Sequence, residues 1–411
     1  MHKSLARSAI ARTFVFLFAL LAAAGAQTYS VLTSFDGTDG VGLHTTPLID
    51  SLGNVFGTTV GGGSADCGVV FELVNNGGGS YTNTTIYDFT CGDDGARPEG
   101  GLVMDSAGNL YGIAAIFGAH GAGVAYELVN QGGGTYTFEV IHAFTGGKDG
   151  GDPTGDLVMF KGSLYGVTYD GGVNCGNGIG CGTVYRLTKS GGKWVETVLH
   201  GFNNHGDGYH PYAGVAIDSD GNLYGTTFGG LFANGTVFKL SPQGSGRYKE
   251  TILHTFDHKD RKADGCDIMS GVVLDSAGDL YGTATECGKD GDGTVYQLKR
   301  SGSTYGFKVI LTFNGKNGVN PYDETGHLAV DSAGNVYGTA AEGGAYHYGT
   351  VFKLAAGSFL YTALHEFNDN GTDGYYPYGG VSLDSLGNLY GTTADGGING
   401  DYGTVWQIAN P

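Results

Sequence analysis

The sequence predicts an all-β fold, a seven-bladed β-propeller of four-stranded antiparallel blades. First, the phrase Leu-Tyr-Gly-Thr-Thr, a glycine-rich loop and Gly-Thr-Val-Phe recur about every 55 residues, and such a fixed period is typical of repeat architectures. Second, helix signals are almost absent after residue 26. Third, the two ends of the chain are complementary, incomplete repeats. The phrase is centred on Phe56, Tyr111, Tyr165, Tyr224, Tyr281, Tyr337 and Tyr390.

The fourth repeat shows how one blade is made. Four short runs with strand composition cover residues 214–217, 223–227, 236–240 and 248–256. The turn Asp218-Ser219-Asp220-Gly221-Asn222 separates the first two, with an aspartate that can bond its own backbone and a glycine that accepts a positive φ. Four short strands with turn signals at this spacing predict one propeller blade.

The chain ends predict how the ring closes. The sequence begins with a lone fourth-type strand, Tyr29 to Phe35, and ends with a third-type strand, Thr404 to Ile408. We therefore expect the N-terminal strand to complete the last blade, which would close the ring and protect its open edge.

Residues 1–26 resemble an export leader. Lys3, Arg7 and Arg12 precede a short apolar stretch, and Ala24-Gly25-Ala26 supplies small residues for cleavage. We expect export, and a mature chain of residues 27–411 that forms a single propeller domain. No second hydrophobic run follows, so we expect a secreted, extracellular protein without a membrane anchor of its own.

Composition narrows the classes of partner. The chain has 40 acidic and 21 basic residues, with a formal net charge of −19, which argues against nucleic acids and anionic membranes. We expect a monomer without a cofactor. We expect no metal site either, since the sequence has no Cys-x-x-Cys pair and no histidines paired at ligand spacing. Catalytic triads, phosphate loops and nucleophile elbows are also missing from the sequence.

The repeated phrases resemble a known family. Asp-Ser-x-Gly-Asn-Leu-Tyr-Gly-Thr-Thr and Gly-Thr-Val-Phe-Lys-Leu are similar to the GloVer (Gloeobacter/Verrucomicrobia-type) tandem repeat of secreted bacterial proteins, and more loosely to NHL repeats. The resemblance covers residues 29–408. It implies export and a propeller-like fold, and it assigns no activity to any residue.

One face of the predicted propeller is variable. The loop between strands two and three and the link from strand four to the next blade emerge together there, and function in such scaffolds lies on variable loops. All six cysteines fall in these segments, and topology favours the pairs Cys67–Cys91, Cys175–Cys181 and Cys266–Cys287. They either stiffen a binding face or stabilise the long loops of an exported protein.

Aromatic residues gather in three of the links, which lead into the innermost strands. Tyrosines near the channel mouth could stack on sugar rings and hydrogen-bond through their hydroxyl groups. The alternative is that proline and tyrosine only pack the blade junctions. The candidate ligand-binding residues are Tyr209, His210, Tyr212, Tyr322, Tyr375, Tyr376 and Tyr378.

Four acidic residues occupy one repeat position, five residues after the tyrosine of the phrase, where strand two ends. They are Asp170, Glu286, Glu342 and Asp395. Carboxylates from different blades could bind a cation or form an acid/base pair, and glycosidases need two carboxyl groups about 5–10 Å apart. The alternative is a solvated acid before a glycine turn.

The histidines predict little chemistry. One position in strand four holds His142, His200, His254 and His365, but elsewhere it holds Thr33, Tyr87 and Leu311. A position that accepts leucine is expected to be a packing site.

These observations favour a non-catalytic extracellular module that binds carbohydrate or another surface ligand at the loop-rich face. A second hypothesis is a glycoside hydrolase or polysaccharide lyase that uses the loop carboxylates. A third is a structural or adhesive envelope protein.

Overall fold

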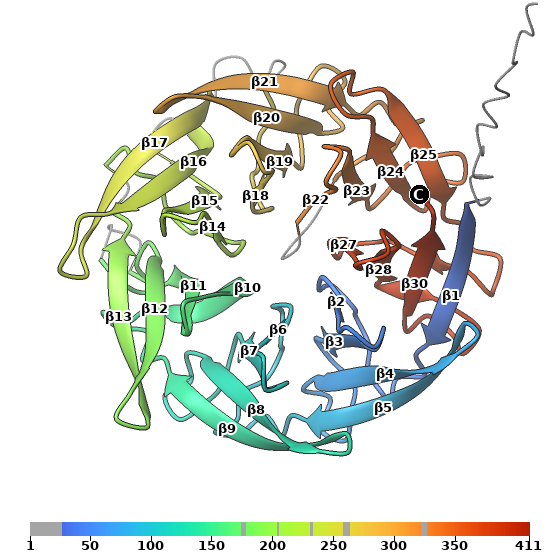
Figure 1. Ribbon diagram of the computed structural model, residues 1–411, viewed down its shortest axis with the longest axis horizontal. Coiled ribbons are helices and arrows are strands. Elements are labelled where there is room, and N and C mark those ends of the chain that lie inside the picture. Colours follow the sequence, from blue (N-terminus) through green and yellow to red (C-terminus); the bar gives the residue numbers. More distant parts are fainter. Residues whose placement is uncertain (1–26, 174–177, 204, 231–232, 258–263, 322–326) are drawn as a thin grey trace, which may run out of the picture.

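The computed structural model describes residues 27–411 except 174–177, 204, 231–232, 258–263 and 322–326. The predicted leader, Cys175 and Tyr322 lie outside the described residues. The structure consists of seven four-stranded antiparallel sheets arranged in a ring, which confirms the seven-bladed propeller (Figure 1). In each blade the strands run in chain order from the innermost to the outermost, except that the last blade takes its outer strand from the N-terminus.

The first four blades have the following strands. Blade 1 contains β2 (Leu48–Ile49), β3 (Val55–Thr59), β4 (Val69–Gly77) and β5 (Ser80–Asp88). Blade 2 contains β6 (Val103–Met104), β7 (Leu110–Ala114), β8 (Val124–Gly132) and β9 (Thr135–Ala143). Blade 3 contains β10 (Gly151–Phe160), β11 (Ser163–Asp170), β12 (Thr183–Ser190) and β13 (Lys193–Gly201). Blade 4 contains β14 (Ala216–Ile217), β15 (Leu223–Thr227), β16 (Ala233–Pro242) and β17 (Tyr248–Asp257).

The other three blades complete the ring. Blade 5 contains β18 (Val273–Leu274), β19 (Leu280–Ala284), β20 (Thr294–Ser301) and β21 (Thr304–Thr312). Blade 6 contains β22 (Ala329–Val330), β23 (Val336–Ala340), β24 (Thr350–Leu354) and β25 (Tyr361–Glu366). Blade 7 contains β27 (Ser382–Leu383), β28 (Leu389–Thr393), β30 (Thr404–Ala409) and β1 (Thr28–Ser34). A small ribbon of β26 (Gly374–Tyr375) and β29 (Asp395–Gly396) lies outside these sheets.

A close glycine–aromatic contact explains why the phrase repeats. Gly225 on β15 pairs with Phe238 on β16, and a Cβ atom at residue 225 would lie 2.5 Å from the Phe238 ring. The ring therefore needs a residue without a side chain beside it, and it is fully buried. The same pairing joins Gly57 to Phe71, Gly112 to Tyr126, Gly166 to Tyr185, Gly282 to Tyr296, Gly338 to Phe352 and Gly391 to Trp406.

The acidic turn of the phrase is closed by its own side chains. In blade 4 the Asp218 carboxylate accepts hydrogen bonds from the backbone N–H groups of Asp220 and Asn222, from the Asn222 side chain and from the Tyr224 hydroxyl. These bonds lower the pKa of Asp218 although burial acts in the opposite direction. The aspartate, asparagine and tyrosine of the phrase thus form one structural unit.

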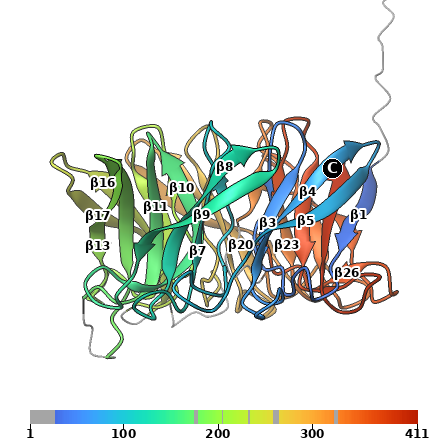
Figure 2. The same ribbon diagram turned by 90° about the horizontal axis from the view of Figure 1, so that it is seen from below.

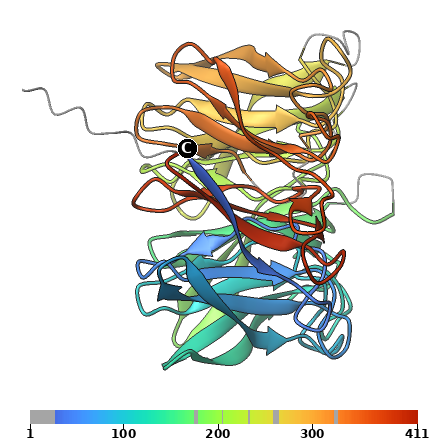
Figure 3. The ribbon, with the colours of Figure 1, turned by 90° about the vertical axis from the view of Figure 1, so that its right-hand side faces the viewer.

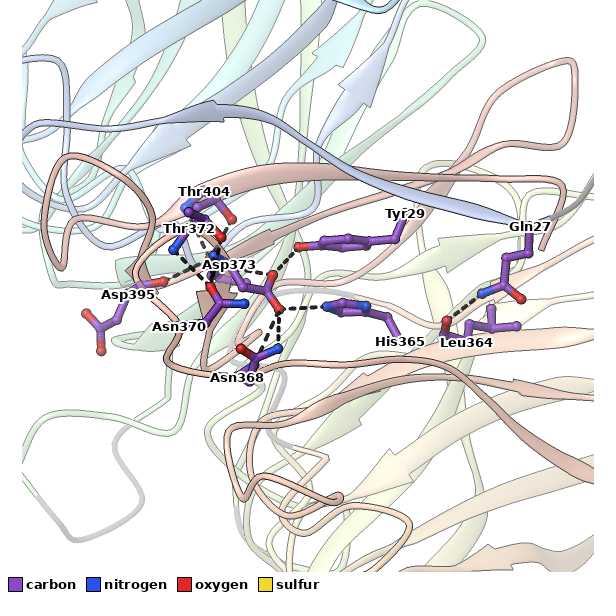
Figure 4. A network of polar contacts seen from close by, with 12 residues as sticks. Gln27, Tyr29, Leu364, His365, Asn368, Asn370, Thr372, Asp373, Asp395 and Thr404 are labelled. Atoms are coloured by element: carbon purple, nitrogen blue, oxygen red, sulfur yellow. Dashed lines mark hydrogen bonds and ion pairs between the residues drawn. The ribbon is translucent and has the colours of Figure 1, made fainter.

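The N-terminal strand completes blade 7, as predicted. Strand β1 pairs with β30 from Thr28 opposite Ala409 to Ser34 opposite Thr404 (Figures 1 and 3). Figure 4 shows the side-chain contacts that β1 also makes with His365 of blade 6 and with Asp373 of the link that follows it. The Tyr29 hydroxyl donates to Asp373 at 2.6 Å, the ring stacks on His365 with centroids 3.5 Å apart, and His365 lies 2.9 Å from the same carboxylate.

Two of the predicted disulfides are present in the structure. Cys67 is bonded to Cys91, and Cys266 to Cys287. The pairing of Cys175 with Cys181 stays a prediction, because Cys175 lies outside the described residues. Disulfides of this kind are typical of an oxidising compartment. In the part of the chain that the structure describes, no helix has the length and apolar character needed to cross a membrane.

Candidate binding sites on the loop face

The segments that connect strands two and three, and those that connect successive blades, lie on the same face of the ring, opposite the short hairpin turns (Figure 2). We call this the loop face. Each link pairs with the end of a second strand through its backbone, for example Val319 with Glu342 and Cys266 with Glu286. In blade 7 the same pairing forms the β26–β29 ribbon, with Tyr375 opposite Asp395. The same backbone pairing therefore holds the links at equivalent positions around the ring.

At one equivalent position in every link the residue adopts a left-handed backbone. The φ angle is +53° at His210 and +55° at Tyr376, in the region that side chains other than glycine seldom occupy. Backbone bonds hold the conformation: His210 donates to the carbonyl of Cys181, and its own carbonyl accepts from Phe228. Such strained residues gather at functional sites. The full set is Gly42, Arg97, Asp152, His210, Asp267, Asn320 and Tyr376.

Two carboxylates line a cavity of about 420 Å³ on the blade 2 and blade 3 side of the loop face. They are Asp152, one of the left-handed residues, and Asp170, at the end of β11. Burial, followed by the charges of Glu99 and Asp170, raises the pKa of Asp152 to about 7, and Arg97 partly opposes this. Burial also raises the pKa of Asp170, and His210 counteracts it.

His210 lies beside Asp170 and is buried. The residue is 6% exposed, and its ring stacks on Tyr169 with centroids 4.2 Å apart. The Nδ1–H group donates to the Tyr169 carbonyl at 2.8 Å and lies 3.6 Å from Asp170. Tyr209 and Tyr212 are half-buried beside it, and Tyr212 meets Tyr169 edge to face. We call Asp152, Asp170, His210 and Tyr169 the acidic cluster.

A second group is aromatic and lies where blades 6, 7 and 1 meet. Tyr376 and Tyr378 are nearly parallel, with centroids 6.0 Å apart, and His44 packs edge-on against Tyr378. Tyr348 contacts both Tyr375 and Tyr376. All five side chains are half-buried. We call this the tyrosine group: His44, Tyr348, Tyr375, Tyr376 and Tyr378.

Carboxylates border the tyrosine group. Burial, and then the neighbouring Glu342, Tyr348 and Asp395, raise the pKa of Tyr376. The Tyr375 hydroxyl donates to Asp401 at 2.9 Å. Burial and the charge of Asp401 raise the pKa of Asp395. Aromatic faces and hydrogen-bond acceptors thus lie side by side.

The four carboxylates predicted from the sequence therefore have different surroundings. Asp170 lies beside His210, whereas Glu342 and Asp395 lie beside Tyr376 from two different blades. Glu286 pairs with Cys266 through its backbone. Sequence reasoning missed Asp152, Tyr169 and Tyr348. Asp152 could have been found from its place before the recurring proline, which His210 and Tyr376 share.

The histidine position in strand four is more than a packing site. His254 lies 3.1 Å from Asp264, and at the equivalent position the Tyr87 hydroxyl donates to Asp94. The acid belongs to the link that follows, where it also accepts backbone N–H bonds, as Asp94 does from Thr90. The position accepts Leu311 because asparagine, Asn317, replaces the acid in that link.

Comparisons with known proteins agree with the architecture. The Gloeobacter/Verrucomicrobia repeat matches residues 16–179, 118–268 and 229–411. A candidate 6-phosphogluconolactonase from Bacteroides fragilis is 16% identical with a TM-score of 0.51, over 82% of this chain and 87% of that one. A protein from Lactobacillus plantarum is 14% identical with a TM-score of 0.53, over 83% and 88%. At this identity the likeness concerns the fold alone. The search of curated proteins found no match.

Proposed function

The chain belongs to the Gloeobacter/Verrucomicrobia repeat family, and on that repeat scaffold we propose that it binds carbohydrate outside the cytoplasm through the tyrosine group. The observation that carries the proposal is the parallel pair Tyr376 and Tyr378, half-buried on the loop face with Glu342 and Asp395 beside Tyr376. Partly exposed rings fixed by neighbours can stack on the apolar face of a sugar.

The surroundings of the pair suit a neutral, hydroxyl-rich ligand. Carboxylates and tyrosine hydroxyls bordering the rings could accept and donate the hydrogen bonds that a sugar offers. Two more exposed tyrosines lie in the loops of blades 6 and 7: Tyr346 is 55% exposed and Tyr402 is 38% exposed. The chain's net charge of −19 disfavours an anionic polysaccharide.

Replacing both Tyr376 and Tyr378 by alanine should weaken glycan binding at least tenfold, because buried aromatic anchors commonly contribute about 2 kcal/mol or more each to a binding site. The measurement is isothermal calorimetry on the mature chain with a glycan first identified on a glycan array. Leu386→Ala is the matched control, since Leu386 is 85% exposed in the turn on the opposite face. Unchanged affinity in the double variant would exclude the tyrosine group.

One observation favours a second candidate, glycoside hydrolysis at the acidic cluster. A carboxyl group that keeps its proton near neutral pH, beside a second carboxylate, is the arrangement that a glycosidase uses for its general acid. Asp152, with its pKa raised to about 7, would be the acid, and Asp170 would be the base or nucleophile.

If this candidate is correct, Asp152→Asn should lower the hydrolysis rate by at least a hundredfold, since general acids contribute about 10²–10⁴-fold. In the parent chain the rate should fall as pH rises through 7, because the raised pKa keeps Asp152 protonated only below that pH. A reducing-end assay over pH 4–9 measures both. Asp93→Asn, an exposed acid, should leave the rate unchanged. Full activity in Asp152→Asn would eliminate the acidic cluster, and binding without any turnover would favour the tyrosine-group proposal.

A further inference from the structure

A recurring three-residue contact joins the outer strands of neighbouring blades. One residue comes from strand four, the second is the acid of the link that follows, and the third stands four residues before the equivalent strand-four position in the next blade. We call this contact the junction triad. With a histidine in strand four, the triads are His142/Asp149/Glu196, His200/Asp207/Glu250, His254/Asp264/Phe307 and His365/Asp373/Tyr29.

In two of these triads the next blade contributes an aromatic ring. His254 stacks on Phe307 with centroids 3.7 Å apart and an interplanar angle of 4°. Its Nε2 atom lies 3.1 Å from Asp264, at hydrogen-bond distance. The histidine is therefore satisfied by two protein partners, and this triad has no need of a ligand.

In the triad between blades 3 and 4, a glutamate, Glu250, occupies the position that Phe307 has in the His254 triad. His200 Nε2 lies 3.5 Å from Asp207 and 3.6 Å from Glu250 Oε1. Neither contact has hydrogen-bond geometry, and His200 Nε2 and Glu250 Oε1 are both buried polar atoms without a hydrogen-bond partner. The three side chains are 19%, 8% and 17% exposed. Polar atoms left unpaired in this way require explanation.

The charges of the triad also favour a bound cation. Two carboxylates meet in a largely buried junction, and His200 is the partner of both among the ion pairs of the described residues. Burial of two carboxylates costs free energy unless a cation or a proton compensates the negative charge. A doubly charged cation between them would supply that compensation and would satisfy the two unpaired atoms.

We propose that His200, Asp207 and Glu250 bind one divalent transition-metal ion of the zinc class, which links blade 3 to blade 4. Donors bound about 2.0–2.1 Å from a tetrahedral ion lie about 3.4 Å apart, close to the spacings measured from His200. All three donor atoms lie within 4.8 Å of one another. One imidazole and two carboxylates form a suitable donor set for such an ion.

Two similar clusters are weaker candidates. His142, Asp149 and Glu196 are the same residue types as the proposed site. In the described part of the chain, however, only the triad between blades 3 and 4 brings its three donor atoms within 4.8 Å of one another. Cys266, Asp267 and Glu286 also lie together, but the Cys266 sulfur is already bonded to Cys287. The binding stoichiometry should therefore be one ion per chain.

The test uses the untagged mature chain, stripped with a chelator and titrated with Co²⁺ and then Zn²⁺. Co²⁺ should produce the visible absorption of a tetrahedral site at one equivalent, and Zn²⁺ should displace it. Glu250→Phe is the matched variant, because it reproduces the residues of the His254 triad and should fold normally. This variant should lose the Co²⁺ spectrum and bind Zn²⁺ at least tenfold more weakly.

A second variant tests the choice of triad independently. Glu196→Phe removes the glutamate of the His142 triad, whose three donors do not all lie within 4.8 Å of one another, so it should leave the stoichiometry at one ion and the Co²⁺ spectrum unchanged. The proposal is overturned if the parent chain shows no tetrahedral Co²⁺ spectrum. It is also overturned if Glu250→Phe keeps the parent's stoichiometry and affinity, since the ion would then lie elsewhere. If the parent chain binds no metal, a proton on Glu250 would account for the unpaired atoms, and the proposal would be wrong.

Discussion

A variant that starts at Asp36, and so lacks β1, should fail to form a stable propeller. Strand β1 covers the outer edge of β30, and without it that edge would expose unpaired backbone groups. The loss also removes Phe35, which is fully buried against Phe71 of blade 1, and a buried phenylalanine alone contributes about 3–5 kcal/mol. Since the free energy of unfolding of native proteins is only about 5–15 kcal/mol, circular dichroism and thermal melting should show an unfolded or aggregated protein.

A milder variant removes one specific contact of β1 and leaves the strand itself in place. Tyr29→Phe keeps the strand and the ring that stacks on His365, but it removes the hydroxyl that donates to Asp373 (Figure 4). This variant should fold and lose about 1–3 kcal/mol, because a buried carboxylate then lacks one of its donors. A truncated chain that melts as the parent does would show that the ring does not depend on β1.

Adding a single methyl group at the tightest of the glycine–aromatic contacts should be strongly destabilising. A Cβ atom at residue 391 would lie 2.2 Å from the Trp406 indole, a fully buried side chain. Gly391→Ala should therefore cost about 1–3 kcal/mol by overpacking, and Trp406→Ala about 3–5 kcal/mol by leaving a cavity. Urea denaturation measures both free energies of unfolding.

The two sites should not behave additively. Trp406→Leu in the Gly391→Ala background removes the ring that clashes with the new methyl group, so the double variant should be more stable than the sum of the single changes predicts. Gly306→Ala on β21 provides the control for an alanine in place of glycine, because the backbone of Gly306 is not left-handed and a Cβ atom there would meet only the Lys299 carbonyl oxygen, at 4.0 Å. Simple additivity of the two core changes would contradict the steric origin of the repeated phrase.

Most of the fold can be predicted from the repeated phrase. Gly225 with Phe238, and Asp218 with Asn222 and Tyr224, are physical units that recur in the blades, so the amino-acid sequence itself displays their periodicity. The incomplete repeats at the two ends then predict the pairing of β1 with β30. These contacts are predictable because each lies within one repeat or at the seam between the two chain ends.

The candidate sites are harder to predict, because their contacts cross between blades. His254 and Asp264 are ten residues apart, while His365 and Asp373 are eight apart, so the pair has no fixed spacing. The third member of each junction triad comes from the next blade, as Glu250 does for His200. Leu311 at the same position suggests packing, and the change of its link partner to Asn317 becomes meaningful only in three dimensions.

The pairing of β1 with β30 also constrains the order of events during folding. Thr28 is among the first residues of the ring to be synthesised, and its partner Ala409 is among the last. Bringing such distant segments together requires closing a loop as long as the chain itself, which makes the last step slow. Each of the other six blades uses strands that are consecutive in the chain, but the seventh cannot form until β30 has been synthesised.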